Sequence, residues 1–297
     1  MEASNRSSAY TVSLVSTKGG VGKSTLCANI SALCADLGLR VLVIDCDTQA
    51  SMSKFFRIAD RADYGLGRVL RTRQIDADCI SRSDIDNLDL IMWDADVLGA
   101  LESLKLGFRG EQAIEQALQT VRDADLYDLV LIDTQGATGF LQDLGVVPAD
   151  MILCPVVPEI LSAREFHDAV VPLLQRYAQG APGTRLATVP CKAVINQRTR
   201  TTDAREITAA IRQSFPTLRG RMSICVTEIP KAAAYTRGAT LQVPVHRLEP
   251  DSDKAGGSAS KTLHHLVWEL FPHLTGRFVP GSDAADDLLP EAVGALT

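Results

Sequence analysis

STKGGVGKST, residues 16 to 25, is the most informative stretch of this sequence. It nearly matches the phosphate-binding pattern G-x-x-x-x-G-K-[ST], in which glycine amides and a lysine hold phosphates at the start of a helix. Thr17 stands where the first glycine is expected, and a second lysine, Lys18, precedes the expected one at Lys23. The loop is therefore either a degraded phosphate loop or a variant in which the extra lysine has its own function.

The segments on both sides of this loop predict a strand, a helix and a second strand. The apolar run YTVSLVS (10–16) precedes the loop, and residues 26–37 carry leucine and isoleucine at helical spacing. The run RVLVIDCD (40–47) then has the composition of a buried strand that ends in acids. This order is the opening of a parallel α/β sheet, so we expect the loop to bind a nucleotide.

The rest of the chain continues the alternation. Strands are expected at 88–93, 127–133, 150–157, 186–196 and 222–226, and helices at 110–124, 160–178, 203–215 and 258–271. This pattern predicts one doubly wound, mostly parallel sheet with helices on both faces. We expect an extension over residues 1–9, one P-loop domain over 10–272 and an acidic, flexible tail over 273–297.

Composition limits the class of protein. The 297 residues contain no apolar run long enough for a membrane span and no signal-like start, so we expect a cytoplasmic protein. The seven cysteines are scattered singly, without the spacing of a metal site. The net charge of −6 is uneven: residues 76–128 contain 13 acids and 4 bases, whereas residues 192–237 contain 9 bases and 3 acids. One basic face on an acidic protein is therefore possible.

The loop residues have distinct chemical roles in a phosphate site. Glycines allow consecutive N–H groups to curl around phosphates, the lysine reaches the β and γ phosphates, and the serine hydroxyl holds Mg²⁺. The expected nucleotide contacts are Gly19, Gly20, Val21, Gly22, Lys23, Ser24 and Thr25.

Three acids end buried strands that should lie beside this loop. Asp45 and Asp47 end the run 40–47, and Asp133 ends YDLVLID. We expect Asp45 and Asp133 to serve magnesium together with Ser24, and Asp47 to orient the attacking water. The alternative for Asp47 is that it only caps the following turn.

Together, KGGVGKST, the D-x-D-x-Q of residues 45–49 and LVLIDT (129–134) resemble the ParA family of partition ATPases, within the wider group that includes MinD. The resemblance extends over roughly residues 10–271 and, with few residues before the first strand, is to the family's short form without a helix-turn-helix extension. It implies ATP and Mg²⁺ as cofactors and a deviant Walker A loop, which lacks the first glycine. Lys18 would reach the partner's ATP in a nucleotide-sandwich homodimer, and Asn196 and Pro230 match positions that hold adenine.

The chain also departs from the family pattern. The family usually has threonine where Ser24 stands, and prolines where this chain has Thr48 and the pair Gln135-Gly136. Because proline fixes φ, its loss predicts more mobile switch segments.

The basic stretch has two interpretations. The family resemblance implies nonspecific binding of double-stranded DNA, whereas such runs are otherwise solvated helix faces with scattered ion pairs. The candidate DNA contacts are Arg198, Arg200, Arg219, Arg221, Lys231 and Arg237. The C-terminal segment is acidic, unlike MinD's basic amphipathic tail, which disfavours membrane binding.

The leading hypothesis is a weak, nucleoid-associated ATPase that dimerises with ATP, binds DNA, and segregates a plasmid or chromosome with a ParB-like adaptor that stimulates hydrolysis. Two alternatives stay open. One is an ATPase that positions another cargo or assists conjugative DNA transfer. The other is a nucleotide-gated regulatory protein with little hydrolysis, to which the altered positions Thr48 and Gln135-Gly136 point. A reductase that resembles the nitrogenase iron protein is disfavoured because no cysteine pair is placed to bridge a cluster.

Overall fold

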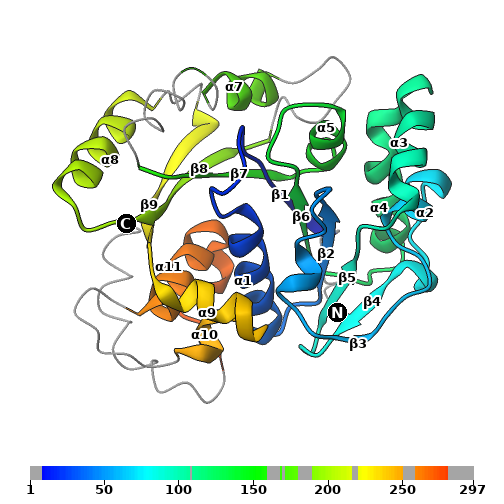
Figure 1. The fold of residues 1–297 in the computed structure, drawn as a ribbon, viewed down its shortest axis with the longest axis horizontal. Coiled ribbons are helices and arrows are strands. Elements are labelled where there is room, and N and C mark those ends of the chain that lie inside the picture. The colour runs from blue at the N-terminus through cyan, green and yellow to red at the C-terminus, as the bar shows by residue number, and fades with distance from the viewer. Residues whose placement is uncertain are drawn as a thin grey trace, which may run out of the picture.

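The computed structural model describes residues 9–107, 109–158, 168, 171–179, 189–215, 220–249 and 258–279. These residues form one nine-stranded sheet covered by helices on both faces (Figure 1). The strands are β1 (Tyr10–Leu14), β2 (Val41–Cys46), β3 (Ile58–Asp60), β4 (Ser81–Ser83), β5 (Leu88–Ile91), β6 (Leu129–Thr134), β7 (Met151–Val156), β8 (Cys191–Arg198) and β9 (Met222–Pro230). The α-helices are α1 (Lys23–Asp36), α2 (Leu66–Thr72), α3 (Asp96–Leu106), α4 (Ala113–Asp123), α5 (Phe140–Val146), α7 (Val171–Gln179), α8 (Thr202–Ser214), α9 (Ala233–Leu241), α10 (Val245–Leu248) and α11 (Ala259–Leu270).

The sheet has the order β3-β4-β5-β2-β6-β1-β7-β8-β9. All neighbours from β5 to β9 are parallel, and β4 is antiparallel to both β3 and β5. β1 lies inside the sheet between β6 and β7, with β2 to β6 on one side of it and β7 to β9 on the other. The predicted doubly wound, mostly parallel sheet is confirmed, and ligands of such sheets bind at the carboxyl ends of the strands.

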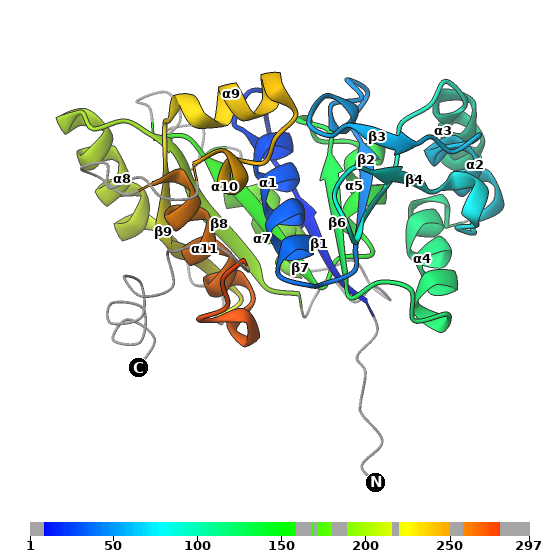
Figure 2. The same ribbon diagram turned by 90° about the horizontal axis from the view of Figure 1, so that it is seen from below.

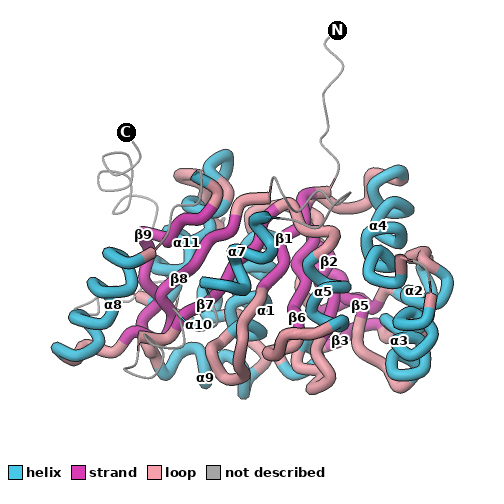
Figure 3. The backbone as a smooth tube through the Cα atoms, turned by 90° about the horizontal axis from the view of Figure 1, so that it is seen from above, coloured by secondary structure: helices cyan, strands magenta, loops and turns pink. Residues whose placement is uncertain are grey.

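Side chains alternate between two packed layers along each central strand. In β6, Leu129 and Leu131 pack with α1, α10 and α11, whereas Val130 and Ile132 pack with α2, α3 and α4. Farther along the sheet, β7 and β8 are packed by α7 and α8 on this second face. Figure 2 shows α1, α9, α10 and α11 together on the first face, and Figure 3 shows α5, α7 and α8 from the opposite direction. Apolar runs without polar alternation are explained by this burial on both sides.

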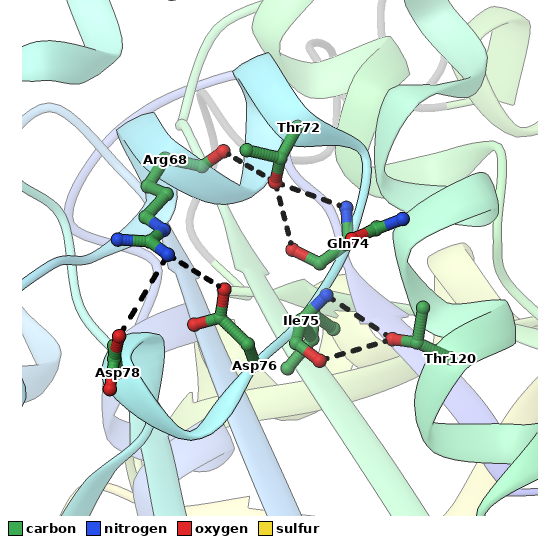
Figure 4. A network of polar contacts seen from close by, with 7 residues as sticks. All are labelled: Arg68, Thr72, Gln74, Ile75, Asp76, Asp78 and Thr120. Carbon is green, nitrogen blue, oxygen red and sulfur yellow. Dashed lines mark hydrogen bonds and ion pairs between the residues drawn. The ribbon is translucent and has the colours of Figure 1, made fainter.

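A polar network holds the loop after α2 (Figure 4). Arg68 of α2 contacts Asp76 at 3.1 Å and Asp78 at 3.8 Å. The Ile75 amide donates to Thr120 Oγ1 on α4 at 3.2 Å. Part of the acidic stretch is therefore used in ion pairs and turn contacts that fix this edge of the molecule.

Each predicted strand and helix has a counterpart in the described residues, while several other elements were not predicted. These are β3, β4, α2, α3, α5, α9 and α10. The antiparallel strands β3 and β4 have three residues each, which is too short for a periodic apolar pattern. Residues 160–170 of one predicted helix, apart from residue 168, lie outside the described residues, and so do residues 186–188 of one predicted strand.

The first part of the predicted tail packs against the domain. Leu274 is fully buried, and the ring of Phe278 lies edge-on to Trp268 with 5.1 Å between centroids. The packed structure therefore continues past the expected boundary at 272 and reaches at least residue 279, whereas 280–297 and 1–8 lie outside the described residues. Within the described part of the chain, no helix combines the length and apolar character needed to cross a membrane.

Candidate nucleotide and magnesium site

The phosphate loop joins β1 to α1 and has a backbone shape that requires glycine. Gly20 and Gly22 have φ angles of +77° and +86°, in the left-handed region that glycine adopts without strain. The Leu26 amide donates to the Gly22 carbonyl at 2.9 Å and begins α1. No side chain of the described residues caps this helix start, so its first N–H groups are available to an anion.

Two buried aspartates lie side by side next to this helix start. Asp45 of β2 and Asp133 of β6 are register neighbours and are 1% and 0% exposed. Ser24, in the first turn of α1, donates from Oγ to Asp133 Oδ2 at 2.5 Å. The strand ends and the loop thus bring together the three side chains that the sequence assigned to magnesium.

Burial raises the pKa of both carboxyls. It raises the pKa of Asp133 to about 7, although the hydrogen bond from Ser24 acts in the opposite direction. It raises the pKa of Asp45 to about 6, although the Met52 and Asp47 amides donate to its oxygens at 2.9 and 3.1 Å. Asp133 Oδ1 is buried and has no hydrogen-bond partner among the described residues. A cation beside this pair would stabilise both charged forms.

The donor set fits magnesium better than a softer metal. It consists of one hydroxyl and two carboxylates, which are hard oxygen ligands. The described residues contain no group of three or more His, Cys, Asp or Glu side chains that could enclose a metal ion. An ion here would need water and phosphate oxygens to complete its shell, as Mg²⁺ usually does.

Asp47 and the two lysines have different surroundings. Asp47 is 9% exposed, and its Oδ1 accepts a hydrogen bond from the Gln49 amide at 3.0 Å. Asp47 therefore caps the following turn in this structure, which was the alternative interpretation of this residue. Lys23 is buried at 5% exposure beside the loop, and Lys18 is partly exposed.

The predicted adenine positions lie next to the loop. Asn196 Nδ2 donates to the Val21 carbonyl at 2.7 Å, so this residue supports the loop backbone. A cavity of about 310 Å³ separates the loop from α9, and both Asn196 and Pro230 line it. Its other lining residues are Gly22, Thr25, Leu26, Gln197, Lys231, Ala232, Tyr235, Thr236 and Ala239. The cavity is adjacent to the phosphate loop and is of the size class that holds a base.

Sequence analysis missed part of this cavity. Gln197 Nε2 donates to the Gly20 carbonyl at 3.0 Å, in parallel with the contact made by Asn196. Its position directly after Asn196 was the available signal. Tyr235 and Thr236 lie on α9, a helix that was not predicted and whose sequence gave no apolar period.

The predicted basic residues that the structure describes lie at two opposite edges of the sheet. One edge is formed by the carboxyl ends of the parallel strands, and the other by their amino ends. Arg198, Arg200 and Lys231 line one cavity of about 420 Å³ at the carboxyl ends of β8 and β9, and Arg237 follows on α9. Arg221 precedes β9 and therefore lies at the opposite edge. Arg198 pairs with Glu228 at 2.6 Å, and Arg219 lies outside the described residues. Of these residues, Lys231 also lines the cavity beside the phosphate loop.

A parallel sheet with a glycine-rich loop between β1 and α1, above two strand-end carboxylates, defines a P-loop nucleotide-binding protein. Residues 9–173, more than half of the chain, match the family model described as "AAA domain". The chain therefore belongs to this family, as one of its ParA-type members, and the resemblance recognised from the sequence is confirmed. It is 29% identical over 160 residues to the chromosome partitioning protein ParA of Caulobacter vibrioides, a match that covers 51% of this chain and 57% of that protein.

Solved structures show the same fold. The complex of a McdA variant from Cyanothece with ATP matches with a TM-score of 0.72 at 18% identity, over 89% of this chain and 97% of that chain. The septum site-determining protein MinD from Pyrococcus horikoshii, in complex with Mg-ADP, matches with a TM-score of 0.67 at 20% identity, over 90% and 98%. The chain spans about half the length of the first curated relatives it matches.

Proposed function

We propose that this chain is an ATPase that binds ATP with Mg²⁺ at the phosphate loop. The observation that carries the proposal is the buried pair Asp45 and Asp133 beside Ser24, with the orphaned Asp133 Oδ1. Burial of two carboxylates is unfavourable unless a cation joins them. The neighbouring phosphate loop would bind a nucleotide whose phosphate oxygens help to hold that cation. The structures of McdA with ATP and of MinD with Mg-ADP support this proposal.

Each residue has a defined role in this reaction. Backbone amides from Gly19 to Thr25 hold the phosphates, and Lys23 contacts the β and γ phosphates. Magnesium held at this site would supply positive charge against the negative charge of the phosphates. Ser24 would contact the ion directly, and Asp45 and Asp133 would orient its water shell. Asp47 would orient the attacking water through the carboxylate oxygen that Gln49 does not use.

Two copies would enclose the nucleotides. Lys18 is part of the loop and is partly exposed, which suits a contact with a phosphate of the partner's ATP. The ATP-bound homodimer would place the carboxyl-edge basic residues of both copies on one surface for double-stranded DNA. Contacts from lysine and arginine to phosphates hold DNA without reading its sequence.

The cellular role that follows is DNA segregation with a ParB-like partner that stimulates hydrolysis. The likeness to the chromosome partitioning protein ParA of Caulobacter vibrioides supports this role. Neighbouring genes are an inexpensive check: a ParB-like gene with repeated DNA sites favours segregation, whereas transfer genes favour conjugation.

ATP turnover by the purified chain tests the proposal. We expect slow turnover that rises with DNA and partner and that is lost in Asp47→Ala, because this variant removes the residue that orients water. Asp47→Asn keeps the turn cap through its amide oxygen and separates folding effects from chemistry. Turnover of the wild type equal to that of Asp47→Ala would contradict the ATPase proposal.

The nucleotide-gated regulator remains the second candidate because Asp47 caps a turn in this structure. In that case ATP would drive dimerisation while turnover stays at the level of Asp47→Ala. Dimerisation measured by sedimentation in ATP, together with turnover, separates the two functions.

A further inference from the structure

Gln142 is a fully buried amide that reaches the phosphate loop from α5. Its Nε2 donates to the Ser16 carbonyl at 2.8 Å and to the Gln135 carbonyl at 3.3 Å. Ser16 begins the phosphate loop, and Gln135 begins the segment after Asp133. One side chain therefore connects the two segments that flank the expected γ-phosphate position.

A second set of contacts fixes this amide from α7. The Tyr177 hydroxyl lies 3.2 Å from Gln142 Oε1 and 3.0 Å from Asp143 Oδ1, and Asp143 pairs with Arg176 at 2.8 Å. Tyr177 is 3% exposed, and burial, with Asp143 nearby, raises its pKa, which keeps the hydroxyl protonated. Its single hydrogen can be donated to Gln142 or to Asp143.

Gly136 shows why the position of this segment matters. A Cβ at Gly136 would lie 2.9 Å from the Lys18 carbonyl oxygen and 3.0 Å from the Gly19 nitrogen. The backbone of the segment after Asp133 is thus closely packed against Lys18, the loop residue proposed to contact the partner's ATP. A side chain at residue 136 would therefore displace either its own segment or the backbone of Lys18 and Gly19.

We propose that Gln142 is a positioning residue that holds Gln135-Gly136 against Lys18, and that Tyr177 orients the Gln142 amide. Hydrogen bonds from one buried side chain then supply the restraint that prolines would otherwise give this segment. The contact extends from the phosphate loop through α5 to the outer helix α7. The restraint is a property of the nucleotide-free chain, whereas its effect on turnover rests on the proposed function.

Hydrogen exchange of the full, nucleotide-free chain tests the restraint directly. Gln142→Leu and Gln142→Glu both remove the amide donors, and Gln142→Glu keeps the shape of the side chain. We expect amides in residues 135–140 to exchange about tenfold faster in both variants, because two hydrogen bonds of about 0.7 kcal/mol each are lost. Wild-type exchange in a folded Gln142→Glu protein would show that only packing matters and would overturn the proposal.

Two further variants leave Gln142 in place, so they test the proposal even where replacement of this buried residue disturbs folding. Tyr177→Phe keeps the ring and should raise exchange about threefold, since one hydrogen bond to the amide is lost. Gly136→Ala should raise exchange in residues 135–140 and in residues 17–20 together, because its Cβ meets the Lys18 backbone. Unchanged exchange in Gly136→Ala would refute the close packing, and unchanged exchange in Tyr177→Phe would refute the role of α7.

Turnover gives the functional readout. In Gln142→Leu we expect kcat for ATP to fall about tenfold while KM stays within about twofold, because Gly20, Gly22 and Lys23 still hold the phosphates. A rise in KM with unchanged kcat would assign Gln142 to binding alone and overturn its positioning role. Absence of turnover in the wild type would instead contradict the proposed function, and the exchange experiment would still decide the restraint.

Discussion

Asp45 and Asp133 occupy matched positions in the adjacent parallel strands β2 and β6, and both side chains are buried. The parallel register forces this arrangement, since Leu14 of β1 is also level with Asp133 and leads directly into the phosphate loop. Two like-charged groups in a site with little solvent repel each other and lose hydration. The strain falls when a proton or a cation joins the pair, which links the stability of the protein to pH and to magnesium.

The nucleotide-free protein should lose stability as pH rises from about 5 to about 8. The carboxyls of Asp133 and Asp45 have pKa values of about 7 and about 6, against an ordinary 3.8. Between these values the folded state binds more protons than the unfolded chain, so the free energy of unfolding falls with rising pH. The stabilisation is complete below about pH 4 and is lost above about pH 7, and the part lost between pH 5 and pH 8 is roughly 4 kcal/mol.

Urea unfolding at several pH values without magnesium measures this dependence. Asp133→Asn should flatten most of the slope because the amide does not titrate. A wild-type free energy of unfolding that rises across the same range would contradict the raised pKa values.

Ser24 should make nucleotide binding depend on magnesium. In Ser24→Ala we expect affinity for Mg-ADP to fall about tenfold, to the level seen without magnesium, since one metal-facing hydroxyl is lost. Affinity for ADP with a chelator should be unchanged. Ser24→Thr is the matched control because it keeps the hydroxyl, and it should bind as the wild type does. Calorimetric titration of ADP into all three proteins, each with magnesium and with a chelator, measures the six affinities that decide the point.

Much of this site could be predicted because it is encoded locally. The loop glycines and Ser24 are adjacent in sequence, and Asp45 and Asp133 each end an apolar run that becomes a buried strand. Parallel strands align their carboxyl ends, so the meeting of these groups follows from the fold.

The remaining contacts depend on tertiary packing. Gln142 reaches Ser16 across 126 residues, and Gln197 reaches Gly20 across 177, without any local pattern that marks either residue. The expected mobility of Gln135-Gly136 was argued from missing prolines alone. In the structure, Gln142 supports this segment by a side-chain bond that sequence reasoning did not foresee. Likewise, Arg221 is close to Lys231 in sequence, but the length of β9 separates the two residues.

Lys18→Ala should separate nucleotide binding from dimerisation. The in-cis contacts of the loop come from its backbone and from Lys23, so ADP affinity of the variant should stay within about twofold of the wild type. ATP-dependent dimerisation should be lost, because the charge that meets the partner's phosphate is gone. Lys23→Ala is the control and should lose nucleotide binding itself. Normal sedimentation of a Lys18→Ala dimer with ATP would show that this lysine has no role across the interface.

DNA binding should depend on the carboxyl edge of the sheet and not on the opposite edge. Arg200 and Lys231 line the cavity at the ends of β8 and β9, whereas Arg221 precedes β9 at the other edge. Each phosphate contact that is removed lowers the slope of log affinity against log salt by about 1 per site. We therefore expect Arg200→Ala and Lys231→Ala each to weaken ATP-dependent DNA binding and to lower this slope, for DNA of any sequence. Arg221→Ala removes the same charge at the opposite edge and should leave affinity and slope unchanged. Equal losses in all three variants would mean that net charge, rather than a surface at the carboxyl edge, determines DNA retention.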